Sequence, residues 1–190
     1  MDTSGNVDHS IYIGNRFEEV NGQCIDLDGF HDGAVRDNWC INRGAVENYP
    51  NGQVAIVINN TNPEMRPVNI EITGNRVAGS KFGALFMIGS GHRIIDNIFE
   101  GLNMAHCDEN AARFGCIFRT KEPAMLESGI YLSRNGTRPA ETSDNVVIGN
   151  RISGYKMRER CIAMGPAVGE NKIVRNACSN SRFQEVSRVP

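Results

Sequence analysis

The sequence predicts an all-β fold in which about five to six coils stack as a parallel β-solenoid. Three observations predict it: a short phrase around Asn that recurs along the chain, a second recurring strand pattern, and a composition that favours strands. The 190 residues include 32 Ile and Val but only 5 Leu, and β-branched side chains suit the pleated surface of a strand. Each repeat is too short to bury its own apolar face, so neighbouring repeats have to cover one another.

The first strand pattern is a phrase built around Asn: an apolar residue, any residue, usually Gly or Asp, then Asn, any residue, and an apolar residue. Its copies occupy residues 12–17, 35–40, 72–77, 94–99, 147–152 and 173–178. We expect each Asn to lie at a bend that tolerates a left-handed backbone, with its amide hydrogen-bonded to the Asn amide of the next coil. The predicted ladder consists of Asn15, Asn38, Asn75, Asn97, Asn150 and Asn176.

A second pattern, a small residue followed by alternating apolar residues, predicts another strand in each coil. Its copies occupy residues 24–29, 55–59, 84–89, 129–133 and 161–165. Alternation points the apolar residues to one face and the intervening residues to the other. The links between the two strand types vary in length, so a coil that returns each strand above its previous copy fits better than hairpins. The rungs of such a coil lie about 4.8 Å apart.

The whole chain, residues 1–190, is predicted to form a single β-helix domain. The coils are expected over residues 10–178, an inserted loop over 102–126 and a polar tail over 179–190. The first Asn phrase leaves little room for the cap that protects a solenoid end from open stacking. We therefore expect either a homo-oligomer whose contacts cover the first coil, or a missing N-terminal region of a longer chain.

Composition and charge argue against several classes of partner. The formal net charge is −2, so no broad electrostatic attraction to nucleic acid or to an anionic membrane is expected. No apolar run approaches the roughly 18 residues of a membrane span. The start of the chain is polar and shows no apolar signal region, which leaves the compartment open.

The chain contains six cysteines, and none belongs to a CxxC pair, which argues against a zinc or thioredoxin-like site. They are Cys24 and Cys161 at one phase of the repeat, Cys40 and Cys178 at another, and Cys107 and Cys116 in the insertion. We expect the four in the repeats to serve as small hydrophobic residues. For Cys107 and Cys116 a short disulfide loop is an alternative, and it would indicate an oxidising compartment.

This arrangement resembles the right-handed parallel β-helix of the pectate-lyase-like superfamily, which carries an Asn ladder at one turn of each coil. The resemblance spans roughly residues 10–178 and implies that the strand at Ile25 and its equivalents form the first sheet. The Asn phrase then forms the end of the second sheet, its bend and the start of the third. The superfamily includes polysaccharide lyases, glycoside hydrolases, epimerases, tailspikes and non-catalytic surface proteins. Its clefts usually lie over the outer face of the first sheet.

Under that layout Asp26 and Asp28 place two carboxylates on the outer face of the first sheet, about 6–7 Å apart at their Cα atoms. Paired carboxylates suit glycoside hydrolysis or calcium-assisted lyase chemistry, so both are candidate catalytic residues and candidate calcium ligands. His31 follows in the next loop as a candidate proton-transfer group. The alternative is a solvated strand that ends in a turn. The Asn-Thr-Asp and Asp-Asp signature pairs are missing, which argues against a polygalacturonase-like activity.

Phe86 and Tyr131 fall on adjacent rungs in the outward column of the first sheet. An exposed aromatic pair of this kind is a candidate platform for stacking sugar rings in a bound substrate. The alternative is that both rings pack beneath the insertion, because a long loop needs an apolar surface to rest on.

Basic residues near the first sheet are the remaining candidates. Arg119 and Lys121 lie in the insertion and are candidates for the basic group with which a lyase removes a proton beside a uronate carboxyl. Arg134, Lys156 and Arg158 lie in loops that enter or leave the first sheet and are candidate contacts to substrate carboxylates. A solvated face is the commoner explanation for such charges.

Two functions follow from these residues. The first is a carbohydrate-active β-helix protein, lyase-like or hydrolase-like, that acts on an acidic or plant-type polysaccharide, with calcium as the candidate cofactor. The second is a non-catalytic solenoid for binding or assembly, such as an adhesin or tailspike segment, which the partly apolar outward columns favour. Both functions predict a secreted or cell-surface protein.

Overall fold

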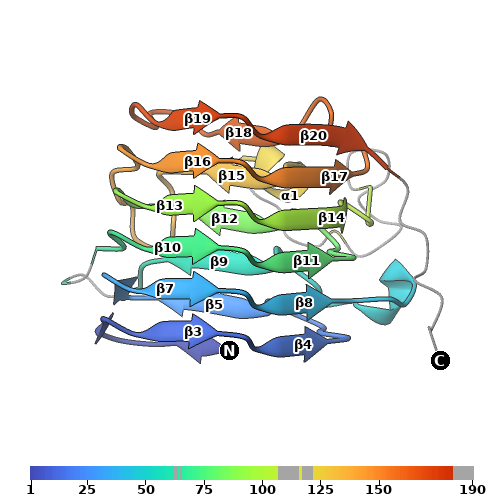
Figure 1. The fold of residues 1–190 in the computed structure, drawn as a ribbon, viewed down its shortest axis with the longest axis horizontal. Coiled ribbons are helices and arrows are strands. Elements are labelled where there is room, and N and C mark those ends of the chain that lie inside the picture. Colours follow the sequence, from blue (N-terminus) through green and yellow to red (C-terminus); the bar gives the residue numbers. More distant parts are fainter. Residues whose placement is uncertain (62–63, 65, 107–115, 117–121, 182–190) are drawn as a thin grey trace.

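The computed structural model of the chain describes residues 1–61, 64, 66–106, 116 and 122–181. In this part of the chain three parallel sheets of six strands each surround one interior (Figure 1). Consecutive strands along the chain belong to different sheets, whereas neighbours within a sheet come from successive coils. The fold is therefore an all-β parallel β-helix of about six coils, as the two recurring patterns predicted.

The first sheet confirms the second recurring pattern as a strand of every coil after the first. Its strands, in order across the sheet, are β1 (Asp2–Thr3), β5 (Ile25–Asp28), β9 (Ile56–Asn59), β12 (Leu85–Met87), β15 (Ile130–Leu132) and β18 (Ile162–Met164). The strand β1 pairs with β5, so the solenoid already begins at Asp2, ahead of the boundary expected at residue 10.

The Asn phrase supplies the other two sheets, with its bend between them. The second sheet consists of β3 (Ile11–Ile13), β7 (Ala34–Arg36), β10 (Glu71–Thr73), β13 (Arg93–Ile95), β16 (Val146–Ile148) and β19 (Lys172–Val174). The third consists of β4 (Arg16–Glu18), β8 (Trp39–Ile41), β11 (Arg76–Ala78), β14 (Ile98–Leu102), β17 (Arg151–Gly154) and β20 (Ala177–Asn180).

Short elements occupy the turns. β2 (Val7–Asp8) and β6 (Phe30–His31) pair where the first sheet leads into the second. The 3-10 helix η1 (Val46–Asn48) and the helix α1 (Ala124–Glu127) lie where the third sheet leads back to the first. Within the described residues no helix has the length and apolar character needed to cross a membrane.

The predicted Asn ladder is present along the bend between the second and third sheets. On each coil the Asn side-chain nitrogen donates to Oδ1 of the Asn one coil further on, at 2.9–3.0 Å. The same Oδ1 also accepts the backbone N–H, for example from Asn75 to Asn97 at 2.9 Å. Asn97 and Asn150 are fully buried. The ladder therefore satisfies polar groups that the stacked coils would otherwise bury without partners.

The ladder Asn residues lie at a bend with left-handed backbone, as expected, and the residue that adopts this backbone is the one before each Asn. These preceding residues have φ between 53° and 72°, and they are Gly14, Asp37, Gly74, Asp96, Gly149 and Arg175. Each Asn has to direct both its backbone N–H and its side chain along the ladder. The tight turn therefore falls on its neighbour, which explains the preference for Gly or Asp at that position.

Two hydrophobic clusters lie on opposite sides of the first sheet. The main core fills the interior with inward residues of all three sheets, such as Leu27, Ile72 and Val77. An outer cluster covers the outside of the first sheet and is formed by Val46, Val54, Phe82, Phe86, Ile88, Ala105, Cys116, Leu126 and Tyr131. The turn containing η1 and the described part of the insertion thus pack against the face where a cleft was expected.

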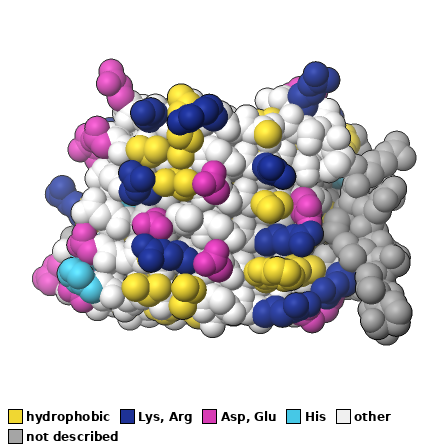
Figure 2. Space-filling model, in the orientation of Figure 1, with side chains coloured by type: hydrophobic (Ala, Val, Ile, Leu, Met, Phe, Trp, Pro, Cys, Tyr) yellow, Lys and Arg dark blue, Asp and Glu magenta, His cyan; other side chains and the backbone are white. Residues whose placement is uncertain are grey.

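The outer faces of the second and third sheets carry rows of hydrophobic and basic side chains (Figure 2). On the third sheet the ring of Trp39 lies between the guanidinium groups of Arg16 and Arg76, at 5.4 and 5.6 Å. The same two arginines form ion pairs with Glu18 and Glu100, both at 2.5 Å. The Trp39 contacts and the Arg76–Glu100 pair link neighbouring coils, whereas the Arg16–Glu18 pair lies within β4.

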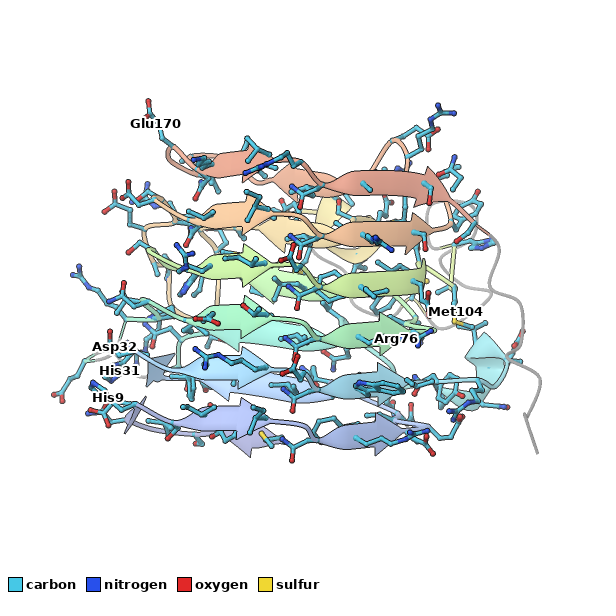
Figure 3. The ribbon with its side chains drawn as sticks, viewed as in Figure 1. His9, His31, Asp32, Arg76, Met104 and Glu170 are labelled. Carbon is cyan, nitrogen blue, oxygen red and sulfur yellow. A yellow bond between two sulfur atoms is a disulfide. The ribbon has the colours of Figure 1, made fainter. Side chains whose placement is uncertain are left out.

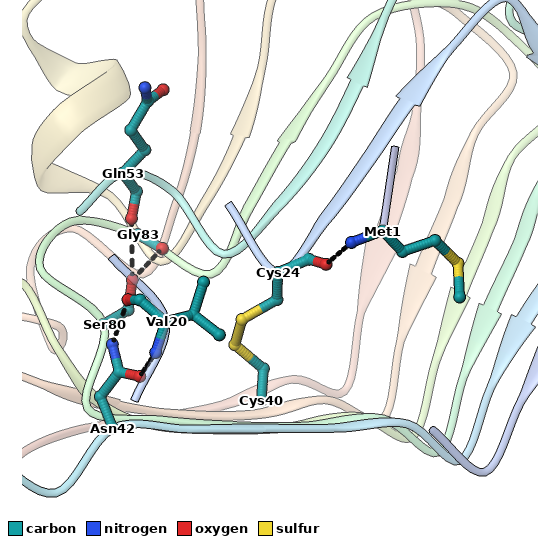
Figure 4. The surroundings of a disulfide bond; sticks show 8 residues. All are labelled: Met1, Val20, Cys24, Cys40, Asn42, Gln53, Ser80 and Gly83. Atoms are coloured by element: carbon teal, nitrogen blue, oxygen red, sulfur yellow. Dashed lines mark hydrogen bonds between the residues drawn. A yellow bond between two sulfur atoms is a disulfide. The ribbon is translucent and has the colours of Figure 1, made fainter. Parts of the chain in front are cut away.

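The cysteines of the repeats form two disulfides, so the expectation that they are only small core residues is wrong. Cys24 bonds to Cys40 and Cys161 to Cys178, with Cα atoms 6.1 and 5.8 Å apart. Each bond joins the beginning and end of one coil, because the chain returns to its starting corner after three strands. The amino group of Met1 donates a hydrogen bond of 2.9 Å to the carbonyl oxygen of Cys24 (Figure 4).

Disulfides of this kind are typical of proteins that fold in an oxidising compartment. Cys116 is also disulfide-bonded. Cys107, its expected partner, lies outside the described residues, so the pairing of these two cysteines stays a prediction.

A second side-chain ladder, which the sequence did not predict, runs along the turn between the first and second sheets. The fully buried His92 accepts the N–H of Ile70 at its Nδ1 (3.1 Å) and donates from Nε2 to the carbonyl oxygen of Ile88 (3.0 Å). Its backbone N–H donates to Oδ1 of Asn145 (2.7 Å), whose amide donates to Asn171 (2.8 Å). These bonds require a neutral imidazole with the proton on Nε2.

The stability of the fold is expected to fall as the pH drops below the ordinary pKa of histidine. Burial lowers the pKa of His92 to about 4, so between pH 6.5 and 4 the unfolded chain binds a proton that the folded chain does not. The stabilisation is complete above pH 6.5 and its loss reaches about 3 kcal/mol near pH 4. Urea denaturation across this range measures it.

The matched variant is His92→Asn, because an Asn side chain occupies the same ladder position on the following coils. Asn offers an acceptor but does not titrate. It should flatten the dependence of the free energy of unfolding on pH between neutral and acid. An equal slope in both proteins would show that His92 does not control this dependence.

Candidate functional site

A groove of about 240 Å³ lies over the outer face of the first sheet, the face on which the superfamily resemblance places a cleft. Its floor is formed by Val57 of β9 and Phe86 of β12. Its walls come from the turns on either side of the sheet. The lining consists of Gln23, Gln53, Val54, Val57, Asn59, Phe82, Phe86, Met125, Leu126, Asn135, Gly136 and Thr137, which we call the first-sheet groove.

One wall of the groove is held in place by a pair of reciprocal hydrogen bonds. Asn59, at the end of β9, donates from its amide to the Thr137 hydroxyl and accepts the N–H of Thr137, both at 2.9 Å. Gly136 lies between them, and a Cβ there would come within 2.6 Å of Oδ1 of Asn59. The loop that carries Asn135 is therefore anchored to a coil far from it in sequence, which gives this wall a fixed position.

The opposite wall carries two amides that are available to a ligand. The Gln23 and Gln53 side chains are half-buried, and neither makes a hydrogen bond to another described residue. Figure 4 shows the Gln53 side chain extending away from Ser80, whose hydroxyl donates to the backbone carbonyl oxygens of Gln53 (3.3 Å) and Gly83 (2.9 Å). Each free amide offers two donors and one acceptor beside the apolar floor.

Phe86 and Tyr131 are stacked, with ring centroids 6.5 Å apart, but they are buried. Only 7% of Phe86 and 3% of Tyr131 is exposed, so the expectation of an exposed aromatic pair is wrong. Both belong to the outer cluster beneath Leu126 of the insertion, as the alternative predicted. Phe86 still contributes to the groove floor, whereas Tyr131 lies outside its lining.

The Tyr131 hydroxyl belongs to a hydrogen-bond network on Glu122. It donates to Oε2 of Glu122 at 2.7 Å, and the Ser133 hydroxyl donates to the same oxygen at 2.8 Å. The amide of Asn135 donates to Oε1. Burial acts to raise the pKa of Glu122, but these hydrogen bonds outweigh burial and lower it overall. The network holds an ionised carboxylate next to the groove wall at Asn135.

Asp26 lies one coil before the groove floor, because it pairs in register with Val57. Its side chain is half-buried, and Oδ1 is buried without a hydrogen-bond partner. Burial, followed by the charges of Asp2 and Asp28, raises the pKa of Asp26 to about 6, although the N-terminal ammonium acts in the opposite direction. Asp26 is therefore a carboxyl that is part protonated near neutral pH.

The other two residues predicted to act with Asp26 are engaged elsewhere. Asp28 accepts the N–H of Thr61 at 2.6 Å and also the Thr61 hydroxyl. The His31 ring hydrogen-bonds to Asp32 (3.0 Å) and to Asn6 (2.7 Å), at the edge of the solenoid where Figure 3 labels it. Within the described residues no group of three or more acidic, His or Cys side chains is arranged to hold a metal ion.

The structure describes three of the five basic candidate residues. Arg119 and Lys121 lie outside the described residues, so their roles stay predictions. Arg134 is exposed next to Asn135 of the groove. The Lys156 ammonium lies 5.0 Å from the ring centroid of Tyr155, and the exposed Arg158 donates its backbone N–H to Asn180. Lys156 and Arg158 are not among the groove residues, and their binding roles also stay predictions.

The groove residues that the sequence did not identify come from the turns. Gln23, Gln53 and Asn135 belong to links whose lengths differ from coil to coil, so no register relates them before the coils are stacked. The only signal was their position immediately beside strands of the first sheet.

The chain is a parallel β-solenoid with a groove on its first sheet. Comparisons with protein-family models, curated proteins and solved structures gave no match. Function therefore has to be argued from the groove itself.

Proposed function

We propose that this protein binds a polysaccharide in the first-sheet groove. The observation that carries the proposal is the combination of an apolar floor at Val57 and Phe86 with the free amides of Gln23 and Gln53. Sugar hydroxyls both donate and accept hydrogen bonds, and a Gln amide can pair with them in both directions. The apolar face of a sugar ring packs on the hydrophobic floor.

The described lining of the groove carries no charged side chain. This composition favours neutral sugar units in the groove, in place of the acidic units considered from the sequence. Carboxyl groups flank this region of the sheet at Asp26 and at Glu122. An acidic polysaccharide would meet these carboxylates, unless basic groups such as the neighbouring Arg134 compensate for them.

Catalysis is a second candidate function, and the environment of Asp26 favours it. A carboxyl with a pKa of about 6 is suited to donate a proton to a glycosidic oxygen. This supports a hydrolase-like activity over a calcium-dependent lyase, because Asp28 is bound to Thr61. The resemblance to the pectate-lyase-like superfamily and the two disulfides are consistent with a secreted protein that acts on polysaccharides.

The double substitution Gln23→Ala/Gln53→Ala is expected to weaken polysaccharide binding at least about tenfold, because two hydrogen bonds to sugar hydroxyls are lost. The measurement is affinity electrophoresis or calorimetry over a panel of neutral and acidic polysaccharides. Ser179→Ala, on the exposed third sheet, is the control and should leave affinity unchanged. If the double variant binds polysaccharide with the same affinity as the wild type, the groove is not the binding site.

The variant Asp26→Asn distinguishes a catalytic function from a purely binding function. The variant removes the proton donor without changing a groove residue, so any cleavage by the wild type should be lost while affinity is retained. Cleavage that continues in the variant would exclude Asp26 as the acid. Binding without cleavage in the wild type would leave the protein a polysaccharide-binding solenoid.

A further inference from the structure

The hydrophobic core is incompletely covered at the two ends of the solenoid. The described residues that are only partly buried against the main core all belong to the first or the sixth coil. At the first coil they are Val7, Tyr12, Phe17 and Val20, and at the sixth they are Ile162, Val168, Ile173 and Cys178. Figure 1 shows these coils as the two flat ends of the stack. Each end presents the cross-section of the core to its surroundings.

The exposure of the core at the ends can be compared within one column of inward side chains on the first sheet. Leu27, Met87 and Leu132 occupy equivalent inward positions on the first sheet and are fully buried. Met164 continues the same column on β18 and is 55% exposed. At the other end Thr3 begins this column and is buried, whereas Met1, which comes just before β1, is 39% exposed. In the described part of the chain, Met164 is therefore the large apolar side chain of this column that lacks a neighbouring coil, because the stack of sheets ends there.

The Asn ladder ends in complementary groups. Each ladder Asn donates its backbone N–H to the Oδ1 of the Asn on the next coil, as Asn150 does to Asn176 at 3.0 Å. Among the described residues, Oδ1 of Asn15 accepts no hydrogen bond and the N–H of Asn176 donates none. One end thus offers an acceptor and the other a donor, at the same place in the cross-section.

We propose that a second copy of this chain stacks head to tail on the first, so that the first coil of one copy covers the sixth coil of the other. The edge strands then continue all three sheets in parallel, with β18 beside β1, β19 beside β3 and β20 beside β4. The N–H of Asn176 meets Oδ1 of Asn15, and the ladder runs on without interruption. This interface is separate from the first-sheet groove.

Side chains that come together in this register are compatible. The column order of the sheets places Ile173 against Tyr12, Cys178 against Phe17 and Val174 against Ile13. The exposed Val174 and Ile13 thereby cover one another.

The charged residues in the edge strands also meet no like charge in this register. Lys172 falls beside Ile11, Arg16 beside Ala177, and Glu18 beside Ser179. No charge in these strands is therefore set against a like charge, so electrostatic repulsion does not oppose this register.

A head-to-head arrangement lacks this complementarity. Two copies of the first coil would set the Asn15 acceptors against one another and would pair the edge strands antiparallel, against the pattern of all three sheets. The head-to-tail contact is heterologous, so every copy keeps one free end of each kind and assembly is open-ended. The wild-type chain should form oligomers whose mean size rises with concentration.

The test uses one substitution at each end, both at exposed positions that folding tolerates. Ile13→Lys places a charge near Lys172 of the neighbouring copy, and Met164→Glu places a charge in the inward column of the first sheet, against Thr3 of the neighbouring copy. Ile98→Lys, an exposed apolar position in the middle of the stack, is the matched control. Sedimentation velocity over a wide concentration range reads out size, and circular dichroism confirms that each variant is folded.

The expected result is that each end variant alone is monomeric, whereas an equal mixture of the two forms dimers and nothing larger. In that mixture only one intact first coil meets one intact sixth coil. The wild type and Ile98→Lys should form the same larger oligomers. A wild type that stays monomeric at all concentrations overturns the proposal. An end variant that dimerises by itself also overturns the proposal, since it has to use two like ends or another surface.

Discussion

Replacement of Asn97 by alanine is expected to lower the free energy of unfolding by about 3 to 5 kcal/mol. Asn97 lies in the middle of the ladder and is fully buried. Its Oδ1 accepts both the N–H (2.9 Å) and the amide (3.0 Å) of Asn75, and its own amide donates to Ile72 and Asn150. Alanine removes these partners and leaves the backbone N–H of Asn75 buried without an acceptor. Chemical denaturation measures the loss.

The matched control is Asn15→Ala, the same substitution at the end of the ladder. Asn15 is only half-buried, and it donates to Asn38 without accepting a hydrogen bond from another coil. Its loss leaves Oδ1 of Asn38 with the backbone N–H of Asn15, so we expect a cost of about 1 kcal/mol. Equal losses at both positions would mean that the ladder stabilises the coils through something other than its buried hydrogen bonds.

The sequence predicted the strands and the ladder because both depend on local spacing. Alternation points Ile25 and Leu27 inward whatever the neighbouring coil contains. The bend needs a residue that tolerates positive φ, and Gly or Asp therefore precedes every ladder Asn except Asn176, which follows Arg175. A repeated bend with a repeated amide then implies stacking, since each amide needs a partner outside its own coil.

The second ladder was missed because its members differ in type. His92 takes the place that Asn145 and Asn171 take on later coils, and the links before them have different lengths. A pattern search that requires identical residues cannot relate an imidazole to an amide, although each provides an acceptor in the same position.

The groove was only partly predictable for a related reason. The sequence, through the superfamily resemblance, placed it on the correct face, but it could not identify Gln23, Gln53 or Asn135 as its walls. These residues come together only when turns from separate coils stack. It also could not decide whether Phe86 faced solvent, because its exposure depends on how the η1 turn and the insertion fold over the sheet.

The disulfides did have a signal in the sequence. The two pairs have nearly equal separations, 16 and 17 residues, because each spans one coil from its first strand to its third. Equal separations mean that closing either loop restricts the unfolded chain to a similar extent. We expect Cys24→Ala/Cys40→Ala and Cys161→Ala/Cys178→Ala each to lower the free energy of unfolding by about 3 kcal/mol, measured by denaturation under oxidising conditions.

The two disulfide variants are expected to differ in local amide exchange, because the two disulfides lie in different coils. The second coil lies between the first and third, whereas the sixth coil is paired on one side only. In a solenoid, stability is the sum of each coil and its contacts with its neighbours, so an end coil can open alone. Loss of Cys161–Cys178 should therefore accelerate amide exchange in β18, β19 and β20, well before global unfolding.

After loss of Cys24–Cys40, the amides of β5, β7 and β8 should still exchange only when the whole stack unfolds, because both faces of that coil remain paired. Faster local exchange in both variants would mean that the coils are held by their disulfides more than by their neighbours. Slow exchange in the sixth coil of the Cys161→Ala/Cys178→Ala variant would mean that its free face is covered, and comparison at low and high protein concentration would show whether a second copy covers it.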